Sequence, residues 1–296
     1  MARGRSHGDD LAAFAGRTAI VTGGASGIGR ALGAHLVAAG AHVMLADIDR
    51  DGAERAAQDL APPVGTRGSI TGVRLDTRDA DAFRALVGDV AANHGGLDFL
   101  FNNAGISIGG PTHELAGEHW NRIVDVNIRG VVNGVLAAYP MMVERGRGHI
   151  VNTASAAGLV APPFVSAYAM TKHAVVGLCA GLRPEAALHG VRVSALCPGS
   201  IDTPILDRLP DTDLPATASI PVTARQYLAV VKQKPIPADR FAREALRRVA
   251  RNEAIIVVPS SAKSPWYLQR LSPRLMEWVT RALARRVDKA LVRARV

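Results

Sequence analysis

The chain has 296 residues, of which 48% are hydrophobic, and this content excludes a disordered chain and suffices for a buried core. The 35 basic side chains exceed the 26 acidic ones, but residues 1–236 hold 21 of each sign, so the excess lies in the last 60 residues. No run of 18 apolar residues occurs, which excludes a membrane-spanning helix. We therefore expect a globular protein with a basic C-terminal part and no nucleic-acid partner.

The cysteines and histidines predict neither a disulfide framework nor a metal site. Cys179 and Cys197 stand alone, and the histidines include no H-E-x-x-H or comparable ligand spacing. The first fifteen residues show no secretory or lipidation signal. We expect a cytoplasmic protein without a metal.

Short apolar runs alternate with longer amphipathic stretches through the first 200 residues. Continuous apolar runs of four to six residues are typical of parallel strands that are covered on both faces. The predicted strands are Thr18–Val21, His42–Ala46, Gly72–Leu75, Phe99–Phe101, His149–Asn152 and Val191–Leu196. The predicted helices between them are Gly27–Ala39, Asp51–Leu60, Asp79–His94, Glu118–Glu144 and Ser166–Leu188. This alternation predicts an α/β fold with a doubly wound, Rossmann-type parallel sheet.

The pattern changes after Pro198. Residues 200–237 predict a long substrate loop with one short helix, and a helix (Asp239–Asn252) and a strand (Ala254–Val258) then complete a sheet of about seven strands. We expect a flexible N-terminus at 1–15, a single domain at 16–262 and a basic amphipathic extension at 263–296.

A glycine-rich turn joins the first predicted strand to the first helix. Glycines at 23, 27 and 29 permit a tight turn, a close approach to a pyrophosphate and close packing of the helix on the strand. The spacing differs from G-x-G-x-x-G, and a plain tight turn would also explain the glycines. Because the turn follows the first strand, it predicts a dinucleotide site that includes Gly23, Ser26, Gly27, Ile28 and Gly29.

Asp47 ends the second predicted strand, where a carboxylate would accept hydrogen bonds from the adenosine ribose. A 2′-phosphate about 4 Å from this carboxylate would cost on the order of 4 kcal/mol per unit charge at an effective dielectric constant of 20. We therefore expect NAD rather than NADP as the cofactor, with Ile48 beside it in the site. Arg50 is the one nearby cation that could compensate.

Tyr168 and Lys172 form a Y-x-x-x-K pair on one face of a predicted helix. A contact on the protein surface is the simplest explanation of such a pair. A tyrosine and a lysine side by side are also suited to acid–base chemistry. A free phenol has a pKa of about 10, and lowering it by 2–3 units takes roughly 3–4 kcal/mol, which a neighbouring ammonium and an oxidised nicotinamide could supply. Ser155, just past a strand end, would be a second hydroxyl for a substrate oxygen.

These features resemble the short-chain dehydrogenase/reductase family. The resemblance rests on T-G-x-x-x-G-I-G, Asn102-Asn-Ala-Gly105, Ser155, Y-x-x-x-K and Pro198-Gly199 in this order, and it covers residues 15–205. It implies reversible hydride transfer between a nicotinamide and a secondary alcohol or ketone. It also implies that Tyr168 is the acid or base, that Ser155 orients the oxygen, and that Lys172 holds the nicotinamide ribose.

The resemblance implies further site residues. Asn127 matches the asparagine that anchors a water in a proton relay to Lys172, and Asp76, with Thr77 beside it, matches the residue that binds adenine N6. Asn103, Ala104 and Gly105 would line the adenine ribose. Pro198, Gly199 and Ile201 would lie against the nicotinamide, and Thr203 would bind its carboxamide. Taken singly, each of these residues is equally typical of an ordinary turn.

The C-terminal part departs from the family pattern. The G-x-x-x-x-V-D-G-G-like stretch of many members is missing, and the ending is more similar to members that handle lipophilic alcohols. Residues 263–296 contain an apolar stripe among basic residues: Leu275, Val279, Ala282, Leu283, Val287, Ala290 and Leu291. The stripe predicts packing on the protein's own helices or on a second subunit, or alternatively a peripheral contact with a membrane.

The sequence therefore predicts an NAD-dependent oxidoreductase for a secondary alcohol or ketone that is bulky and lipophilic. Residues Ile106, Ile108, Val160, Pro162 and Phe164 would line its pocket, together with the loop from Ile205 to Val231. The partners are a small-molecule substrate and, in a homo-oligomer, further copies forming a dimer or tetramer. The alternatives are a non-catalytic NAD(P)-binding or sensing protein and an NADPH-dependent ketone or 3-oxoacyl reductase.

Overall fold

The computed structural model describes residues 9–63, 65, 67–208, 213–217 and 223–293. Its centre is a seven-stranded sheet in the order β3-β2-β1-β4-β5-β6-β9, and every neighbouring pair is parallel. The strands are Thr18–Thr22 (β1), His42–Asp47 (β2), Ser69–Arg74 (β3), Phe99–Asn102 (β4), Gly148–Thr153 (β5), Val191–Pro198 (β6) and Ile255–Val258 (β9). The predicted seven-stranded Rossmann-type sheet is confirmed, with bounds that shift by one to three residues.

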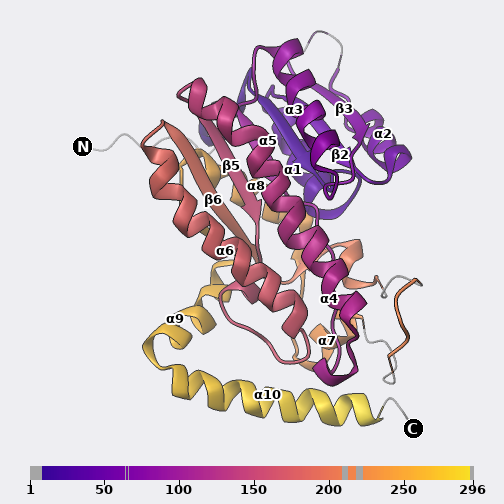
Figure 1. The fold of residues 1–296 in the computed structure, drawn as a ribbon. Helices are drawn as coiled ribbons and strands as arrows, with labels where there is room; N and C mark the ends of the chain where they lie inside the picture. Colours follow the sequence, from indigo (N-terminus) through magenta and orange to yellow (C-terminus); the bar gives the residue numbers. More distant parts are fainter. Residues whose placement is uncertain (1–8, 64, 66, 209–212, 218–222, 294–296) are drawn as a thin grey trace.

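Helices cover both faces of this sheet (Figure 1). They are Gly27–Ala38 (α1), Arg50–Asp59 (α2), Ala80–His94 (α3), Gly117–Val124 (α4), Gly130–Glu144 (α5), Ser166–Ala187 (α6) and Ala238–Ala250 (α8). Such covering explains the continuous apolar strands, because a strand buried on both faces cannot alternate in polarity. All five residues of β1, for example, are buried.

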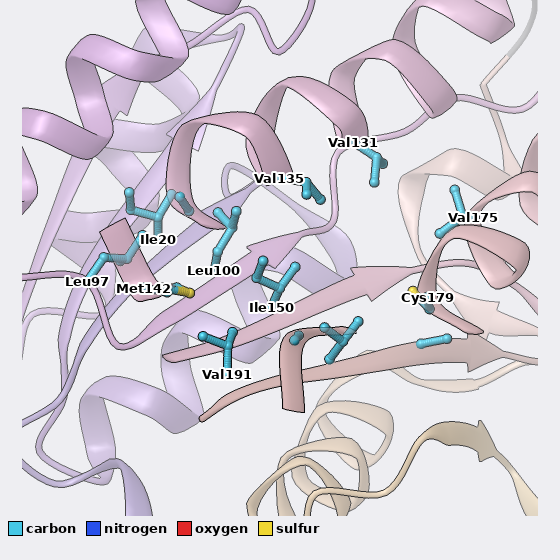
Figure 2. Close-up of a cluster of buried hydrophobic side chains, with 14 of the residues drawn as sticks. Ile20, Leu97, Leu100, Val131, Val135, Met142, Ile150, Val175, Cys179 and Val191 are labelled. Atoms are coloured by element: carbon cyan, nitrogen blue, oxygen red, sulfur yellow. The ribbon is translucent and has the colours of Figure 1, made fainter. Parts of the chain in front are cut away.

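The side chains pack into one core on each face of the sheet. One core joins α1 and α8 to the strands and includes Leu32, Leu36, Phe241 and Leu246. The other lies beneath α3, α5 and α6, and Figure 2 shows its side chains reaching from helix and strand toward one another, among them Val131, Val135, Ile150 and Val175. These cores fix the sheet, and the sheet positions the loops at its carboxyl end.

The N-terminal segment differs from the expected flexible stretch at 1–15. Residues Asp9–Phe14 form a 3-10 helix, and the Phe14 ring is fully buried against Phe99 at a centroid distance of 4.9 Å. Burial of this ring ties the segment to the core, and residues 1–8 lie outside the described residues.

The single long helix predicted at Glu118–Glu144 has three parts. A π-helical turn at Asp125–Arg129 interrupts it between α4 and α5. π-turns of this kind are frequent at functional sites because they displace one side chain from the regular helical pattern. Here the turn contains Asn127.

The expected substrate loop at 200–237 contains short elements. Ile201–Asp202 (β7) pairs with Ile236–Pro237 (β8), and a 3-10 turn at Pro204–Leu206 and a helix at Ala224–Val230 (α7) lie between them. Arg225 of α7 forms ion pairs with Asp202 and Asp207 at 2.8 and 2.6 Å. These ion pairs hold α7 against the chain that leaves β6. Residues 209–212 and 218–222 of the loop are outside the described residues.

Two helices form the C-terminal extension: Lys263–Leu271 (α9) and Pro273–Arg293 (α10). In Figure 1, α10 crosses the molecule beside α7, and the two helices are in contact. Met276 and Val287 are its most deeply buried side chains, whereas Leu275 of the predicted stripe is exposed. Among the described residues, no helix is long and apolar enough to cross a membrane.

Candidate active site

The glycine-rich turn lies at the point where the strand order reverses, between β1 and β4. Open parallel sheets bind ligands in the crevice at such a point. Gly23 has a φ of +66°, and a Cβ built on Gly29 would lie 2.0 Å from the Gly23 carbonyl oxygen. The turn therefore has room for backbone only. Together with exposed Ser26 and half-buried Ile28 at the start of α1, it presents backbone at a helix N-terminus, which suits a pyrophosphate.

Asp47 is held against this turn. Its carboxylate accepts hydrogen bonds from the backbone N–H of Ala25 at 3.0 Å and of Asp49 at 3.1 Å. Ile48, the next residue, exposes 56% of its surface, an unusual position for an isoleucine. Arg50 pairs with Glu54 at 2.8 Å, so its charge is already engaged. The carboxylate and the apolar side chain beside it fit a ribose and an adenine.

The carboxyl end of β4 joins the turn through Thr22. The Thr22 hydroxyl accepts from the backbone N–H groups of Asn103 and Ala104 at 2.9 and 3.0 Å, and the Asn103 amide donates to the Thr22 carbonyl at 3.0 Å. The Thr153 hydroxyl of β5 donates to the side-chain amide oxygen of Asn103 at 3.2 Å. These bonds bring Asn103, Ala104 and Gly105 against the glycine-rich turn.

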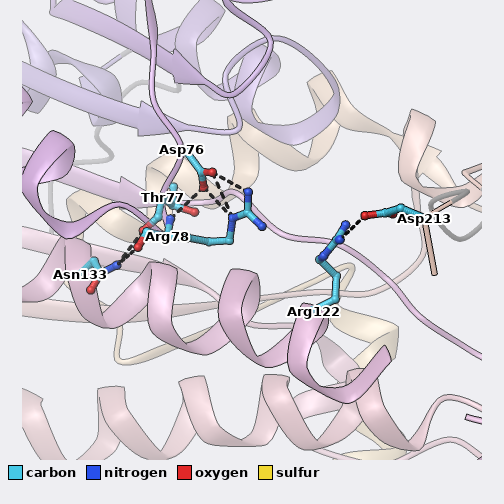
Figure 3. A network of polar contacts seen from close by, with 6 residues as sticks. All are labelled: Asp76, Thr77, Arg78, Arg122, Asn133 and Asp213. Carbon is cyan, nitrogen blue, oxygen red and sulfur yellow. Dashed lines mark hydrogen bonds and ion pairs between the residues drawn. The ribbon is translucent and has the colours of Figure 1, made fainter. Parts of the chain in front are cut away.

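Asp76 and Thr77 follow β3 in a polar network (Figure 3). The Arg78 guanidinium binds both carboxylate oxygens of Asp76, with a shortest distance of 2.6 Å, and holds the pKa of Asp76 below its ordinary value. Asn133 of α5 donates to the Thr77 carbonyl at 2.9 Å. An adenine amino group would therefore share this carboxylate with Arg78, a partner that the sequence analysis did not anticipate.

Ser155, Tyr168 and Lys172 meet at the carboxyl ends of β5 and β6. The Lys172 ammonium is buried, donates to the Thr153 carbonyl at 3.0 Å and lies 5.6 Å from the centre of the Tyr168 ring. Burial raises the pKa of Tyr168, while its hydrogen bond with Ser155 lowers it. Burial lowers the pKa of Lys172 to about 8. The geometry joins a phenol, a hydroxyl and an amine in one small site.

Asn127 faces the same site from the π-turn. Its amide donates to the Ile106 carbonyl at 3.0 Å and to the Thr171 hydroxyl at 3.1 Å, and its oxygen accepts from the Ile106 N–H at 2.9 Å. A Cβ built on Gly105 would lie 3.1 Å from the Asn127 oxygen and 3.4 Å from the Lys172 ammonium. The asparagine and the lysine therefore flank the Gly105 backbone.

The chain leaving β6 closes the other side of the glycine-rich turn. Gly199 N–H donates to the Val258 carbonyl at 2.8 Å, and Pro198 and Ile201 are buried. A Cβ built on Gly27 would lie 3.1 Å from the Thr203 side chain. Pro198, Gly199, Ile201 and Thr203 thus lie beside the crevice that the turn borders.

An apolar cluster packs against the side chain of Tyr168. Ile108, Ile123 and Ala167 are buried there, with Ile106, Leu115, Trp120, Tyr168 and Leu214 packed against them. Of the pocket residues that the sequence predicts, Ile106 and Ile108 belong to this cluster. Leu214 belongs to the loop that the sequence predicts beside the pocket, whereas Trp120 of α4 was not anticipated, because no local pattern distinguishes it from an ordinary core residue.

Comparisons with known proteins agree with this geometry. The family model for short chain dehydrogenases matches residues 17–213, more than half of the chain. The chain belongs to the short-chain dehydrogenase family. It is therefore an oxidoreductase, as the sequence motifs predict.

Individual members of the short-chain dehydrogenase family are also similar. The 2,5-dichloro-2,5-cyclohexadiene-1,4-diol dehydrogenase of Sphingobium indicum is 42% identical over 202 residues, covering 68% of this chain and 78% of that protein. The D-beta-hydroxybutyrate dehydrogenase of Rhizobium meliloti is 33% identical over 226 residues, covering 76% and 86%. A solved short-chain dehydrogenase/reductase from Burkholderia phymatum in complex with NAD has a TM-score of 0.79 at 31% identity, covering 88% of this chain and 95% of that one.

Proposed function

We propose that the protein transfers a hydride between NAD(H) and a secondary alcohol or ketone, with Tyr168 as the acid or base. The observation that carries the proposal is the meeting of Ser155, Tyr168, Lys172 and Asn127 beside the glycine-rich turn. No simple structural role accounts for a buried lysine beside a partly buried phenol that hydrogen-bonds Ser155.

NAD suits the residues around the turn. Gly23, Gly27 and Gly29 leave a backbone cradle that a Cβ would fill, and Asp47 offers a carboxylate next to it. A carboxylate favours the two ribose hydroxyls of NAD over the 2′-phosphate of NADP. The nicotinamide, when bound, would exchange a hydride with the carbinol carbon of the substrate. The NAD in the Burkholderia phymatum relative supports this choice of cofactor.

The side chains of the site divide the proton chemistry among them. In the oxidation direction, Tyr168 takes the hydroxyl proton of the alcohol, and Ser155 donates a hydrogen bond to the substrate oxygen. Lys172 places a positive charge near the phenol, which favours the phenolate. Asn127 fixes the backbone of Ile106 and flanks Gly105 together with Lys172, where its amide would anchor a water in a proton relay to that lysine. In the reduction direction, Tyr168 returns the proton.

The apolar cluster supports a bulky and weakly polar substrate. Ile106, Ile108 and Trp120 pack beside Tyr168, and Leu214 of the substrate loop joins them. Apolar lining favours apolar substrate surface through desolvation. The cyclic diol named for the Sphingobium indicum relative is consistent with this choice, while the Rhizobium meliloti relative represents the small hydroxy acids that would argue against it.

We also propose a homo-oligomer. Leu136 of α5, Met170 of α6 and Leu188 directly after α6 are exposed on the side of the molecule that these helices form. Large apolar side chains on two neighbouring helices favour association with a second copy. Light scattering of the purified protein gives the number of subunits, and a monomer at all concentrations would contradict this part of the proposal.

A panel of alcohols assayed with NAD and with NADP tests the function. We expect turnover of cyclic secondary alcohols with NAD, and at least a 1,000-fold lower kcat in Tyr168→Phe with NAD binding retained, because general acid–base catalysis contributes about 10²–10⁴-fold and this variant also loses a substrate hydrogen bond. Nucleotide binding without any turnover would favour a sensing protein instead. Activity only on small charged hydroxy acids would contradict the proposed substrate class.

A further inference from the structure

Four large apolar side chains are exposed where α9 meets α10. Tyr267 is 51% exposed, Leu271 85%, Leu275 46% and Trp278 68%. They lie within twelve consecutive residues, and half of the large exposed hydrophobic side chains found among the described residues belong to this group. The α9–α10 corner is therefore the most apolar exposed segment of the part of the chain that the structure describes.

The outer face of α10 adds positive charge to this corner. Residues 274, 278, 281, 285 and 289 follow one another at helical spacing, so Arg274, Trp278, Arg281, Arg285 and Lys289 share the solvent-facing side. The opposite side carries the buried Met276 and Val287. Because that side is packed in the molecule, the face with Trp278 stays outward.

Most of these cations have no acidic partner. Arg281 pairs with Glu277, but in the described part of the chain Arg274, Arg285, Arg286 and Lys289 form no ion pair. Three of them border a groove of about 650 Å³ between α10 and α7, which is lined by Ala229, Val230, Ala282, Arg285, Arg286, Lys289 and Ala290. The face thus combines unneutralised charge with exposed aromatic and aliphatic side chains.

We propose that α9 and the outer face of α10 bind the surface of an anionic phospholipid bilayer. Tyr267, Leu271, Leu275 and Trp278 would enter the interfacial region, and Arg274, Arg285 and Lys289 would contact lipid phosphates. Tryptophan and tyrosine favour this interfacial region because one end of each ring is polar, and arginine and lysine near the surface attract acidic lipids.

Charge complementarity selects the bilayer over a second copy of the chain. A symmetric dimer through this face would bring two groups of unpaired cations together, and like charges in contact oppose association. The phosphates of a nucleic acid would also attract the cations, but a phosphate backbone offers no apolar surface for the exposed leucines beside them. A bilayer with acidic headgroups satisfies the charges and the apolar side chains at once.

Binding in this orientation would place the substrate loop next to the membrane, because α10 packs on α7. A lipophilic alcohol could then reach the site from the bilayer. The membrane contact does not depend on the proposed oxidoreductase activity, since none of its residues belongs to the catalytic site, and the two proposals therefore fail independently.

Flotation of the full-length protein with vesicles tests the proposal. We expect binding to phosphatidylcholine vesicles that contain 30% phosphatidylglycerol, little binding to pure phosphatidylcholine, and release in 0.5 M salt. Each basic residue near the surface adds roughly 1 kcal/mol to binding, so Arg285→Gln with Lys289→Gln should weaken the partition coefficient about 30-fold. Leu271→Ser with Trp278→Ser should weaken it by at least 10-fold.

A matched variant elsewhere controls for a general change of charge. Arg240→Gln removes an exposed arginine of α8 that lies outside both the proposed membrane face and the proposed subunit contact. It should leave vesicle binding unchanged within 2-fold. Equal binding to neutral and anionic vesicles, or equal effects of the control and test variants, would overturn the proposal. It would also be overturned if the test variants changed the subunit number and no vesicle binding occurred.

Discussion

The side-chain amide of Asn127 forms hydrogen bonds with both backbone groups of Ile106, at 2.9 and 3.0 Å. The two residues come from different parts of the chain, the π-turn between α4 and α5 and the loop after β4. An amide that satisfies a backbone donor and a backbone acceptor fixes that backbone in one position. This contact connects the crevice side of the site with the helix that carries Tyr168, through the bond from Asn127 to Thr171.

Replacing this amide should affect stability and catalysis together. Asn127→Ala removes three hydrogen bonds of a buried side chain, each with a net contribution of about 1 kcal/mol, so we expect the free energy of unfolding to fall by roughly 2–3 kcal/mol. Denaturant unfolding measures this loss. Because Ile106 and Lys172 lose a fixed neighbour, kcat should fall at least 10-fold.

Asn133→Ala is the matched control, since Asn133 also holds a loop backbone, that of Thr77, from α5. It should raise the KM for the nucleotide with little change in kcat. If Asn127→Ala changed the KM for nucleotide alone, the catalytic placement of Asn127 would be wrong.

The preference for NAD should depend on Asp47. Asp47→Ser removes the charge but keeps an acceptor for the Ala25 N–H. At about 4 Å one charge pair costs on the order of 4 kcal/mol in a partly screened site, so the ratio of kcat/KM with NAD to kcat/KM with NADP should fall at least 10-fold. Asp51→Ser removes an exposed carboxylate in the first turn of α2 and should leave this ratio unchanged. Steady-state kinetics with both nucleotides measures the ratio, and equal effects of the two variants would contradict the assignment of Asp47.

Gly29 should tolerate no side chain. In Gly29→Ala the new Cβ would lie 2.0 Å from the Gly23 carbonyl oxygen, so the glycine-rich turn must move. We expect a loss of about 1–3 kcal/mol in stability, as for other overpacked sites, and at least 10-fold weaker nucleotide binding by calorimetry.

Gly88→Ala provides the contrast, because nothing lies within 4 Å of a Cβ at this position of α3. An open position in a helix gains about 0.5–1 kcal/mol from alanine, so this variant should be more stable and bind nucleotide normally. Similar nucleotide affinities of the two variants would show that the turn does not approach the cofactor.

Acid should destabilise the protein through His149. Burial lowers the pKa of His149 to about 3, and the positive charges of Arg192 and Arg183 act in the same direction. The unfolded chain therefore binds this proton below about pH 6.5 while the folded chain does not. Stability from this group is complete above pH 6.5 and is lost as the pH falls toward 3, with a slope of up to about 1.4 kcal/mol per pH unit.

Unfolding in urea at pH 7 and pH 5 measures this slope, and His149→Gln should reduce it. The Ser194 hydroxyl lies 2.9 Å from His149 Nε2, so glutamine retains a possible partner there. An unchanged slope in the variant would assign the acid sensitivity to other groups.

The sequence by itself determined the strands of the sheet and the order in which the candidate site residues follow one another along the chain. Apolar runs of fixed length, separated by amphipathic helices, encode strands that are buried on both faces, and this local pattern does not depend on distant residues. The same holds for the glycine-rich turn, where the residue type itself reports the backbone geometry. Asp47, Ser155, Tyr168 and Lys172 are proposed as site residues from their positions beside these elements and from the spacing of their motifs.

Tertiary structure decided what these residues contact. The bidentate bond from Arg78 to Asp76, the burial of Phe14 and the presence of Trp120 beside Tyr168 depend on segments that meet only in the folded chain. The periodic apolar pattern also could not reveal the π-turn at Asn127, since one residue inserted into a single turn hardly alters the spacing of the apolar residues.

The C-terminal extension shows the same division. Its sequence determined an amphipathic basic helix, because helical spacing alone sorts apolar and charged residues onto faces. Which face points outward was decided by the rest of the fold, on which α10 packs so that Met276 and Val287 are buried while Leu275 and Trp278 are exposed. The rotation of a helix about its axis is set by its partner, and the partner is fixed only when the whole chain folds.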